Sequence, residues 1–216
     1  MTEIVDLDMA HNIPNWTRRV QKGATNLRVR CGMYDSHLSD ATTLGLHSGD
    51  VVPNTNGLVT VGPYKIITDG SLGSQTACCH HAYPNDPTNF GLFAYEEPTL
   101  REMLKKATDG GFQLAVHAIG DKANSLTLDT LASLPSPPLP GSTIEHAQLL
   151  DFADIPLFKK LGLVASVQPV HMIDDKELCD QFWPGRTERS FPFRSLVEAG
   201  VELRLGSDAP VAPLDP

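Results

Sequence analysis

The sequence is poor in cysteine, has no excess of basic residues and lacks any long apolar run. Four irregularly spaced cysteines (Cys31, Cys78, Cys79, Cys179) among 216 residues argue against a disulfide framework and for reduced thiols. A formal net charge of −9 repels nucleic acid on average, so no nucleic-acid partner is expected. The N-terminus is acidic and lacks the basic segment followed by an apolar segment that is typical of a signal peptide. We therefore expect no signal peptide and no membrane partner. The sequence therefore predicts a cytoplasmic protein.

What the sequence does contain is ordinary for a globular domain: 41% of residues are hydrophobic and 20% are charged. A helical pattern, a glycine stop, an apolar strand and a polar residue at the strand's end recur along the chain, as in 159–168 and 198–208. This repeat predicts strands near 27–31, 64–67, 112–117, 142–146, 163–168 and 202–206. Residues 71–97 and 168–190 are predicted to be long loops.

Six strands that alternate with helices predict an α/β fold with a parallel sheet in one domain, residues 1–216. An open doubly wound sheet and a piece of a (β/α)8 barrel both fit this count. In either, ligands bind at the carboxyl ends of the strands. Lys65, His117, His146 and Asp208 all fall at such ends.

Two histidines and an aspartate at successive strand ends are ligands suited to Zn²⁺, with Fe²⁺ or Mn²⁺ as alternatives. Each residue alone has a plainer interpretation, since a strand-end histidine is often structural and Gly206-Ser207-Asp208 is a good helix N-cap sequence. Their occurrence together, in phase with the strand ends, favours a site for one or two divalent metal ions.

Five motifs in order resemble the amidohydrolase superfamily. They are Lys65–Ser74 (KIITDGSLGS), His117–Asp121 (HAIGD), Ile144–Gln148 (IEHAQ), Ser166–Pro169 (SVQP) and Gly206–Val211 (GSDAPV). Within that superfamily the sequence is most similar to amidohydrolase family 3, the YtcJ-like and N-substituted formamide deformylase-like metal-dependent hydrolases. The resemblance implies a (β/α)8 TIM barrel of the metal-dependent hydrolase type.

The resemblance also implies roles for individual residues. Lys65 matches a lysine that is carboxylated and bridges two metal ions, and a lysine of depressed pKa is suited to that reaction. His117 and His146 match metal-binding histidines. Asp208 matches an aspartate that binds metal and acts as the general base on a bridging water. These four residues are the expected metal site, and Asp208 is the expected catalytic residue.

Other residues point less directly to the site. Gln168 and His171 lie where a substrate is expected, and Arg186 and Arg189 have the charge to hold an anionic or carbonyl group. Each also has an ordinary interpretation as loop chemistry. Gln75 stands where the family commonly has an arginine, which weakens any transfer of substrate specificity.

The family's first barrel strand ends in His-X-His, and this sequence has no His-X-His. We therefore expect an incomplete barrel of about six βα units, without the first strand and the family's small β-sandwich, that is poorly active by itself. The predicted function is metal-dependent hydrolysis of a carbon–nitrogen bond in a small-molecule substrate such as a non-peptide amide. The alternative is an inactive α/β fragment or binding module derived from the family. Assembly into a homo-oligomer is left open.

Overall fold

The computed structural model describes residues 1–214 and contains one sheet of seven parallel strands. Each strand pairs with the next one in the sequence, so the order across the sheet is the order along the chain. The strands are β1 (Glu3–Asp6), β2 (Arg28–Met33), β3 (Val59–Ile67), β4 (Leu114–Ala118), β5 (Thr143–His146), β6 (Val164–Val167) and β7 (Leu203–Leu205).

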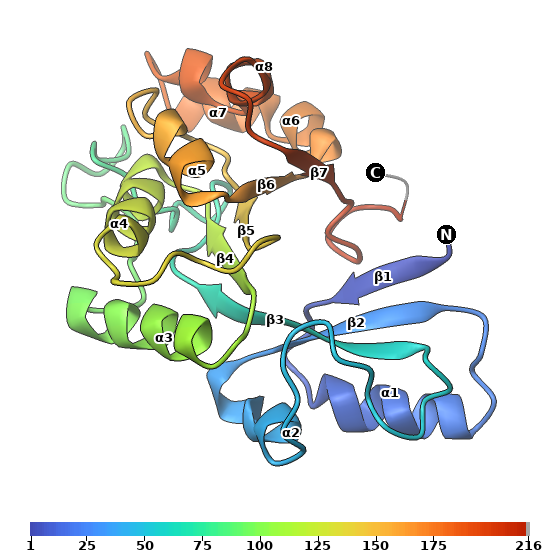
Figure 1. The fold of residues 1–216 in the computed structure, drawn as a ribbon. Coiled ribbons are helices and arrows are strands. Elements are labelled where there is room, and N and C mark those ends of the chain that lie inside the picture. Colours follow the sequence, from blue (N-terminus) through green and yellow to red (C-terminus); the bar gives the residue numbers. More distant parts are fainter. Residues whose placement is uncertain (215–216) are drawn as a thin grey trace.

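This order distinguishes the two architectures that the sequence leaves open. A doubly wound sheet reverses its strand order at one point, and ligands bind there. Here every connection advances the sheet in the same direction, as in a barrel, and the helices lie around the outside of the curled sheet (Figure 1). The fold is therefore an incomplete TIM barrel, as predicted, with β1 and β7 as its two edges.

Helices follow most strands and cover the outer face of the sheet (Figure 1). α3 buries Leu100, Leu104 and Ala107 along one face. α5 is capped by Gly162, whose φ of 66° is a left-handed conformation that glycine adopts easily because it has no Cβ. The helices are α1 (Asn12–Gln21), α2 (Ser39–Thr42), α3 (Glu97–Asp109), α4 (Asp121–Ala132), α5 (Ile155–Leu161), α6 (Pro169–Asp174), α7 (Lys176–Phe182) and α8 (Phe193–Glu198), with 3-10 turns η1 (Asp35–His37) and η2 (Thr187–Arg189).

Two features of the fold correct the sequence-based description. The structure has seven strands and not six, because β1 is a four-residue acidic edge strand with too few apolar positions to stand out. The stretch 168–190, predicted to be a loop, contains α6, α7 and η2. Helices of one or two turns offer too few repeats for a periodic apolar face to show in the sequence.

The apolar core has two parts. The larger one fills the space between the sheet and the outer helices and includes Leu114, Ile144 and Phe158. A smaller cluster around Trp183 and Tyr83 packs beneath the long connections that follow β3 and β6. These connections are therefore fixed by packing of their own and form walls at the carboxyl ends of the strands. In the part of the chain that the structure describes, no helix is both long and apolar enough to cross a membrane.

Candidate metal centre

The four residues predicted to bind metal come from the carboxyl ends of four strands. Lys65 lies near the end of β3, and His117 is the second-last residue of β4. His146 is the last residue of β5, and Asp208 lies in the segment after β7. The strands β3, β4 and β5 are direct neighbours, and Ile67 pairs with His117 while Ala118 pairs with His146. Parallel pairing thus brings the predicted residues to one edge of the sheet.

A compact group of possible metal ligands forms at this edge. Within residues 1–214, ligand atoms of His146, His171 and Asp208 lie within 4.8 Å of one another. The rings of His146 and His171 are stacked, with centroids 6.0 Å apart, and the His117 ring meets the His146 ring edge-on at 4.5 Å. His171, which the sequence suggested only as a substrate contact, is placed here beside His146 by α6.

The hydrogen-bond partners of His117 and His146 indicate opposite tautomers in the neutral rings. His117 Nε2 lies 3.3 Å from the Gly70 carbonyl oxygen and 3.3 Å from Asp69 Oδ1. Both neighbours are acceptors, which in a neutral ring favours a proton on Nε2 and a lone pair on Nδ1. His146 Nδ1 lies 2.8 Å from Gln168 Oε1, whose amide nitrogen donates to the Ser166 carbonyl at 3.4 Å. That second bond orients the amide, so His146 carries its proton on Nδ1 and keeps the lone pair on Nε2.

His146 and Lys65 are both buried where a charge is costly. Burial, followed by repulsion from His117, Lys65 and His171 in their protonated forms, holds the pKa of His146 well below its usual value. The ring is therefore neutral, the form that binds a metal.

Burial also lowers the pKa of Lys65, although the negative charges of Glu145 and Asp208 oppose this. Lys65 is 6% exposed, and among residues 1–214 its amine has no ion-pair or hydrogen-bond partner. A buried amine of lowered pKa without a partner is suited to covalent or metal chemistry.

The backbone at the site is held in an uncommon conformation. His146, Ala147 and Asp208 have φ angles of 72°, 44° and 54°, in the left-handed region that non-glycine residues rarely adopt. Such conformations cluster where geometry is fixed for function. Partial burial raises the pKa of Asp208, while the positive charges of His171, Lys65 and His117 act in the opposite direction.

The remaining predicted residues lie at different distances from this group. Gln168 is buried and contacts His146 directly. Arg189 pairs with the buried Asp121 at 3.1 Å, which ties the η2 segment to the start of α4. Arg186 is 7% exposed, and its Nη2 lies 3.4 Å from the Phe182 carbonyl. A substrate contact by either arginine stays a prediction.

Sequence reasoning passed over two buried carboxylates beside the group. Glu145 is 8% exposed, accepts a hydrogen bond from the Thr143 hydroxyl and contributes negative charge near Lys65. Asp69 has a fully buried side chain 3.3 Å from His117. An acidic residue inside or directly after an apolar strand was the available signal, because burial of a carboxylate needs a specific partner.

The donors present fit a divalent metal ion. Two of the three mutually close ligands are imidazoles and the third is a carboxylate, the set that Zn²⁺ prefers when a position stays open for water. One of the imidazoles, His146, is held neutral with its Nε2 lone pair free. Lys65 and His117 border the same group.

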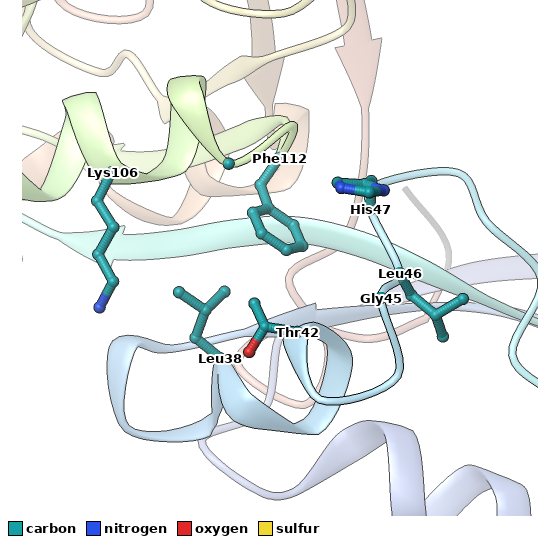
Figure 2. Close-up of a pocket in the computed structure, with 8 residues that line it drawn as sticks. Leu38, Thr42, Gly45, Leu46, His47, Lys106 and Phe112 are labelled. Atoms are coloured by element: carbon teal, nitrogen blue, oxygen red, sulfur yellow. The ribbon is translucent and has the colours of Figure 1, made fainter.

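A separate hollow lies on the outside of the sheet. Leu38 and Thr42 of the α2 region face Lys106 of α3 and Phe112 across a cavity of about 250 Å³, with His47 at its border (Figure 2). Phe112 precedes β4, so this cavity lies toward the amino ends of the strands. It is therefore distinct from the metal-ligand group.

Comparison with known proteins agrees with the fold and the motifs. The sequence profile of the amidohydrolase family matches residues 11–216. The protein LONG AFTER FAR-RED 3 of Arabidopsis thaliana is 38% identical over 161 residues, which cover 72% of this chain and 28% of that protein. The putative amidohydrolase YtcJ of Bacillus subtilis is 32% identical over 159 residues, covering 73% of this chain and 30% of YtcJ.

A solved structure gives the same result in three dimensions. An uncharacterized metal-dependent hydrolase from Pyrococcus horikoshii superposes with a TM-score of 0.82 at 26% identity, covering all of this chain and 42% of that protein. The chain thus spans less than a third of the curated relatives and less than half of the structural one. With the profile matched over nearly its whole length and its strands in the same barrel order, the chain belongs to the amidohydrolase family.

Proposed function

We propose that this chain forms most of the catalytic barrel of a metal-dependent hydrolase that cleaves a carbon–nitrogen bond of a small non-peptide amide. One observation carries the proposal: ligand atoms of His146, His171 and Asp208 converge within 4.8 Å at the carboxyl ends of the strands. Lys65 and His117 lie beside them on neighbouring strands. One relative that is 25% identical over 164 residues is named an N-substituted formamide deformylase, which supports an amide substrate.

The protein's own residues divide the work as follows. A bound divalent ion would be held by His117, His146, His171 and Asp208, and Lys65 would join them as the carbamate that its neutral amine forms with CO2. A divalent ion, when bound, supplies a Lewis acid for the substrate carbonyl and lowers the pKa of water. Asp208 accepts a proton from the attacking water and returns it to the leaving nitrogen. The raised pKa of Asp208 makes its carboxylate a better base than an ordinary aspartate.

The zinc content of the purified chain tests this proposal. We expect at least one Zn²⁺ or Mn²⁺ per chain after incubation with the metal and bicarbonate, measured by inductively coupled plasma mass spectrometry. His146→Ala removes a ligand whose neutral form is fixed by burial, so the bound metal should fall at least tenfold. Release of amine from N-substituted formamides and simple amides is measured on the same samples.

His81→Ala is the matched control, because His81 is exposed and lies in the connection after β3. It should retain the metal content of the parent chain. A parent chain without stoichiometric metal and without hydrolysis, even with metal and bicarbonate supplied, would instead favour the second function class, a non-catalytic binding module. Equal metal loss in both histidine variants would show nonspecific binding and would overturn the proposal.

A further inference from the structure

Asp69 is the second residue after β3, and its carboxylate side chain is fully inaccessible to solvent. Its two oxygens accept hydrogen bonds from three backbone N–H groups. Oδ1 accepts from Ile119 at 3.0 Å, and Oδ2 accepts from Gly120 at 2.8 Å and from Cys78 at 2.9 Å. Such charge-assisted bonds compensate for the loss of water around the carboxylate.

Among residues 1–214, one ionisable side chain lies within ion-pair distance of the Asp69 carboxylate. His117 Nε2 lies 3.3 Å from Asp69 Oδ1, and no lysine or arginine lies within ion-pair distance of it. Because Oδ1 is fixed by the Ile119 amide, it presents an acceptor to the imidazole at a set position. The Gly70 carbonyl oxygen, also 3.3 Å from Nε2, adds a second acceptor on the same side.

The three amides come from two segments that are separate in the sequence. Cys78 belongs to the long connection after β3, whereas Ile119 and Gly120 form the turn between β4 and α4. The segments approach so closely that a Cβ on Gly120 would come within 2.0 Å of the Cys78 carbonyl oxygen. Asp69 thus joins the wall of the site to the strand end that carries His117.

We infer that Asp69 is a positioning residue for His117: its carboxylate holds the imidazole as the Nε2–H tautomer and turns the Nδ1 lone pair away from the loop for use as a ligand. A carboxylate that orients a metal-binding histidine through the opposite ring nitrogen is a general device in metal sites. That His117 then binds a metal rests on the proposed function. The tautomer does not depend on it.

Asp121 offers the matched comparison, because it makes similar backbone contacts without a histidine ring. It too is buried, with Oδ1 accepting from the His80 and Lys122 amides and Oδ2 paired with Arg189. Asp121 therefore serves as the control for a buried aspartate that has a structural role and does not contact a histidine ring. Of these two aspartates, Asp69 is the one whose carboxylate lies beside the His117 ring, 3.3 Å from Nε2.

Long-range ¹H–¹⁵N correlation NMR on the metal-free chain reads the tautomer directly. We expect His117, assigned with a His117→Gln variant, to carry its proton on Nε2 at neutral pH. A wild-type His117 that carries its proton on Nδ1 would overturn the inference whatever the variants do. This measurement also stands if the chain binds no metal, so failure here and failure of the proposed function are separate results.

The variant Asp69→Asn replaces one acceptor oxygen by an NH₂ donor of nearly the same size. We expect the His117 signals to shift toward the Nδ1–H tautomer, and zinc affinity, measured by competition with a chromophoric chelator, to fall about 10- to 100-fold. Asp121→Asn should lower stability yet leave the tautomer unchanged and the zinc affinity within about twofold. If Asp69→Asn keeps the Nε2–H tautomer, or loses no more affinity than Asp121→Asn, then Asp69 does not position His117.

Discussion

The central strands and the edge strands of the sheet differ in both burial and chemistry. In β4, Leu114 is fully buried and His117 alone is half-buried, whereas in β7 Leu205 is 63% exposed and in β1 Val5 is 47% exposed. Each central strand is paired on both sides, while β1 and β7 each pair on one side only within residues 1–214.

The predicted metal residues are divided between these two regions. Lys65, His117 and His146 come from the central strands β3, β4 and β5, where strand pairing on both sides fixes their backbone. Asp208 follows the edge strand β7 and lies in an exposed segment. The part of the candidate site that holds Lys65, His117 and His146 is therefore built into the core. The part that holds Asp208, the proposed base, depends on an edge of the sheet.

The largest effect that tests this comparison is on stability. Leu114→Ala should lower the free energy of unfolding by about 2–5 kcal/mol, because it opens a cavity in the fully buried centre. The matched substitution Leu205→Ala on β7 should cost less than about 0.5 kcal/mol, since that side chain is mostly exposed. Urea unfolding measures both. Similar losses for the two variants would show that the edge is as well packed as the centre.

Hydrogen exchange tests the same contrast without mutation. Amides of β4 and β5 should exchange only through global unfolding, whereas amides of β1 and β7 should exchange through local opening at least about tenfold faster. Mass spectrometry of peptic fragments resolves the four strands. Equal protection across them would contradict the proposed difference between centre and edges.

Asp35 lies in η1 after β2 and joins this segment to β3 and α3, and its removal should have a moderate effect. Its Oδ1 accepts hydrogen bonds from Tyr64 of β3 and Lys106 of α3, both at 2.6 Å, which lower the pKa of Asp35. A carboxyl group whose pKa is lowered in the folded state stabilises the fold at pH values above its ordinary pKa. This stabilisation is lost as the pH falls through the pKa of the folded state. Asp35→Asn should therefore cost about 0.5–1 kcal/mol at pH 7, as expected for partly exposed partners, and less at pH 3.

Ser36→Ala is the control for Asp35, since Ser36 is exposed in the same turn. It should leave the unfolding curve unchanged at both pH values. A loss in Asp35→Asn that grows as the pH falls would have the wrong sign for a carboxylate of lowered pKa and would refute this account.

The smallest expected effect concerns thiol labelling. Cys31 on β2 and Cys79 in the connection after β3 are both inaccessible, and burial raises their pKa to about 12 and about 11 respectively. Without local opening, Cys31 should react more slowly because it has the higher pKa. We expect the reverse order, by several-fold, because β2 is next to the open edge. Slower labelling of Cys31, measured by mass spectrometry of labelled peptides, would indicate a stable edge.

The sequence was sufficient to predict the six strands β2 to β7, since each has an apolar run bounded by glycine, proline or a polar strand end. It was not sufficient for β1 or for α6 and α7, which are too short for a periodic apolar face. It also left open whether the sheet was doubly wound or barrel-like. That choice depends on the direction of each connection, which side-chain patterns along one chain do not encode.

By itself the sequence determined which residue types lie at which strand ends: Lys65, His117, His146 and Asp208 at the carboxyl ends of β3, β4, β5 and β7. Parallel strands bring their carboxyl ends to one edge, so this placement followed from local pattern alone. Only the tertiary structure decided which side chains meet there, because His171 arrives from α6 and Asp69 reaches His117 across a buried turn. Distances between segments remote in the sequence are set by packing, and packing decides which acceptors the rings of His117 and His146 meet.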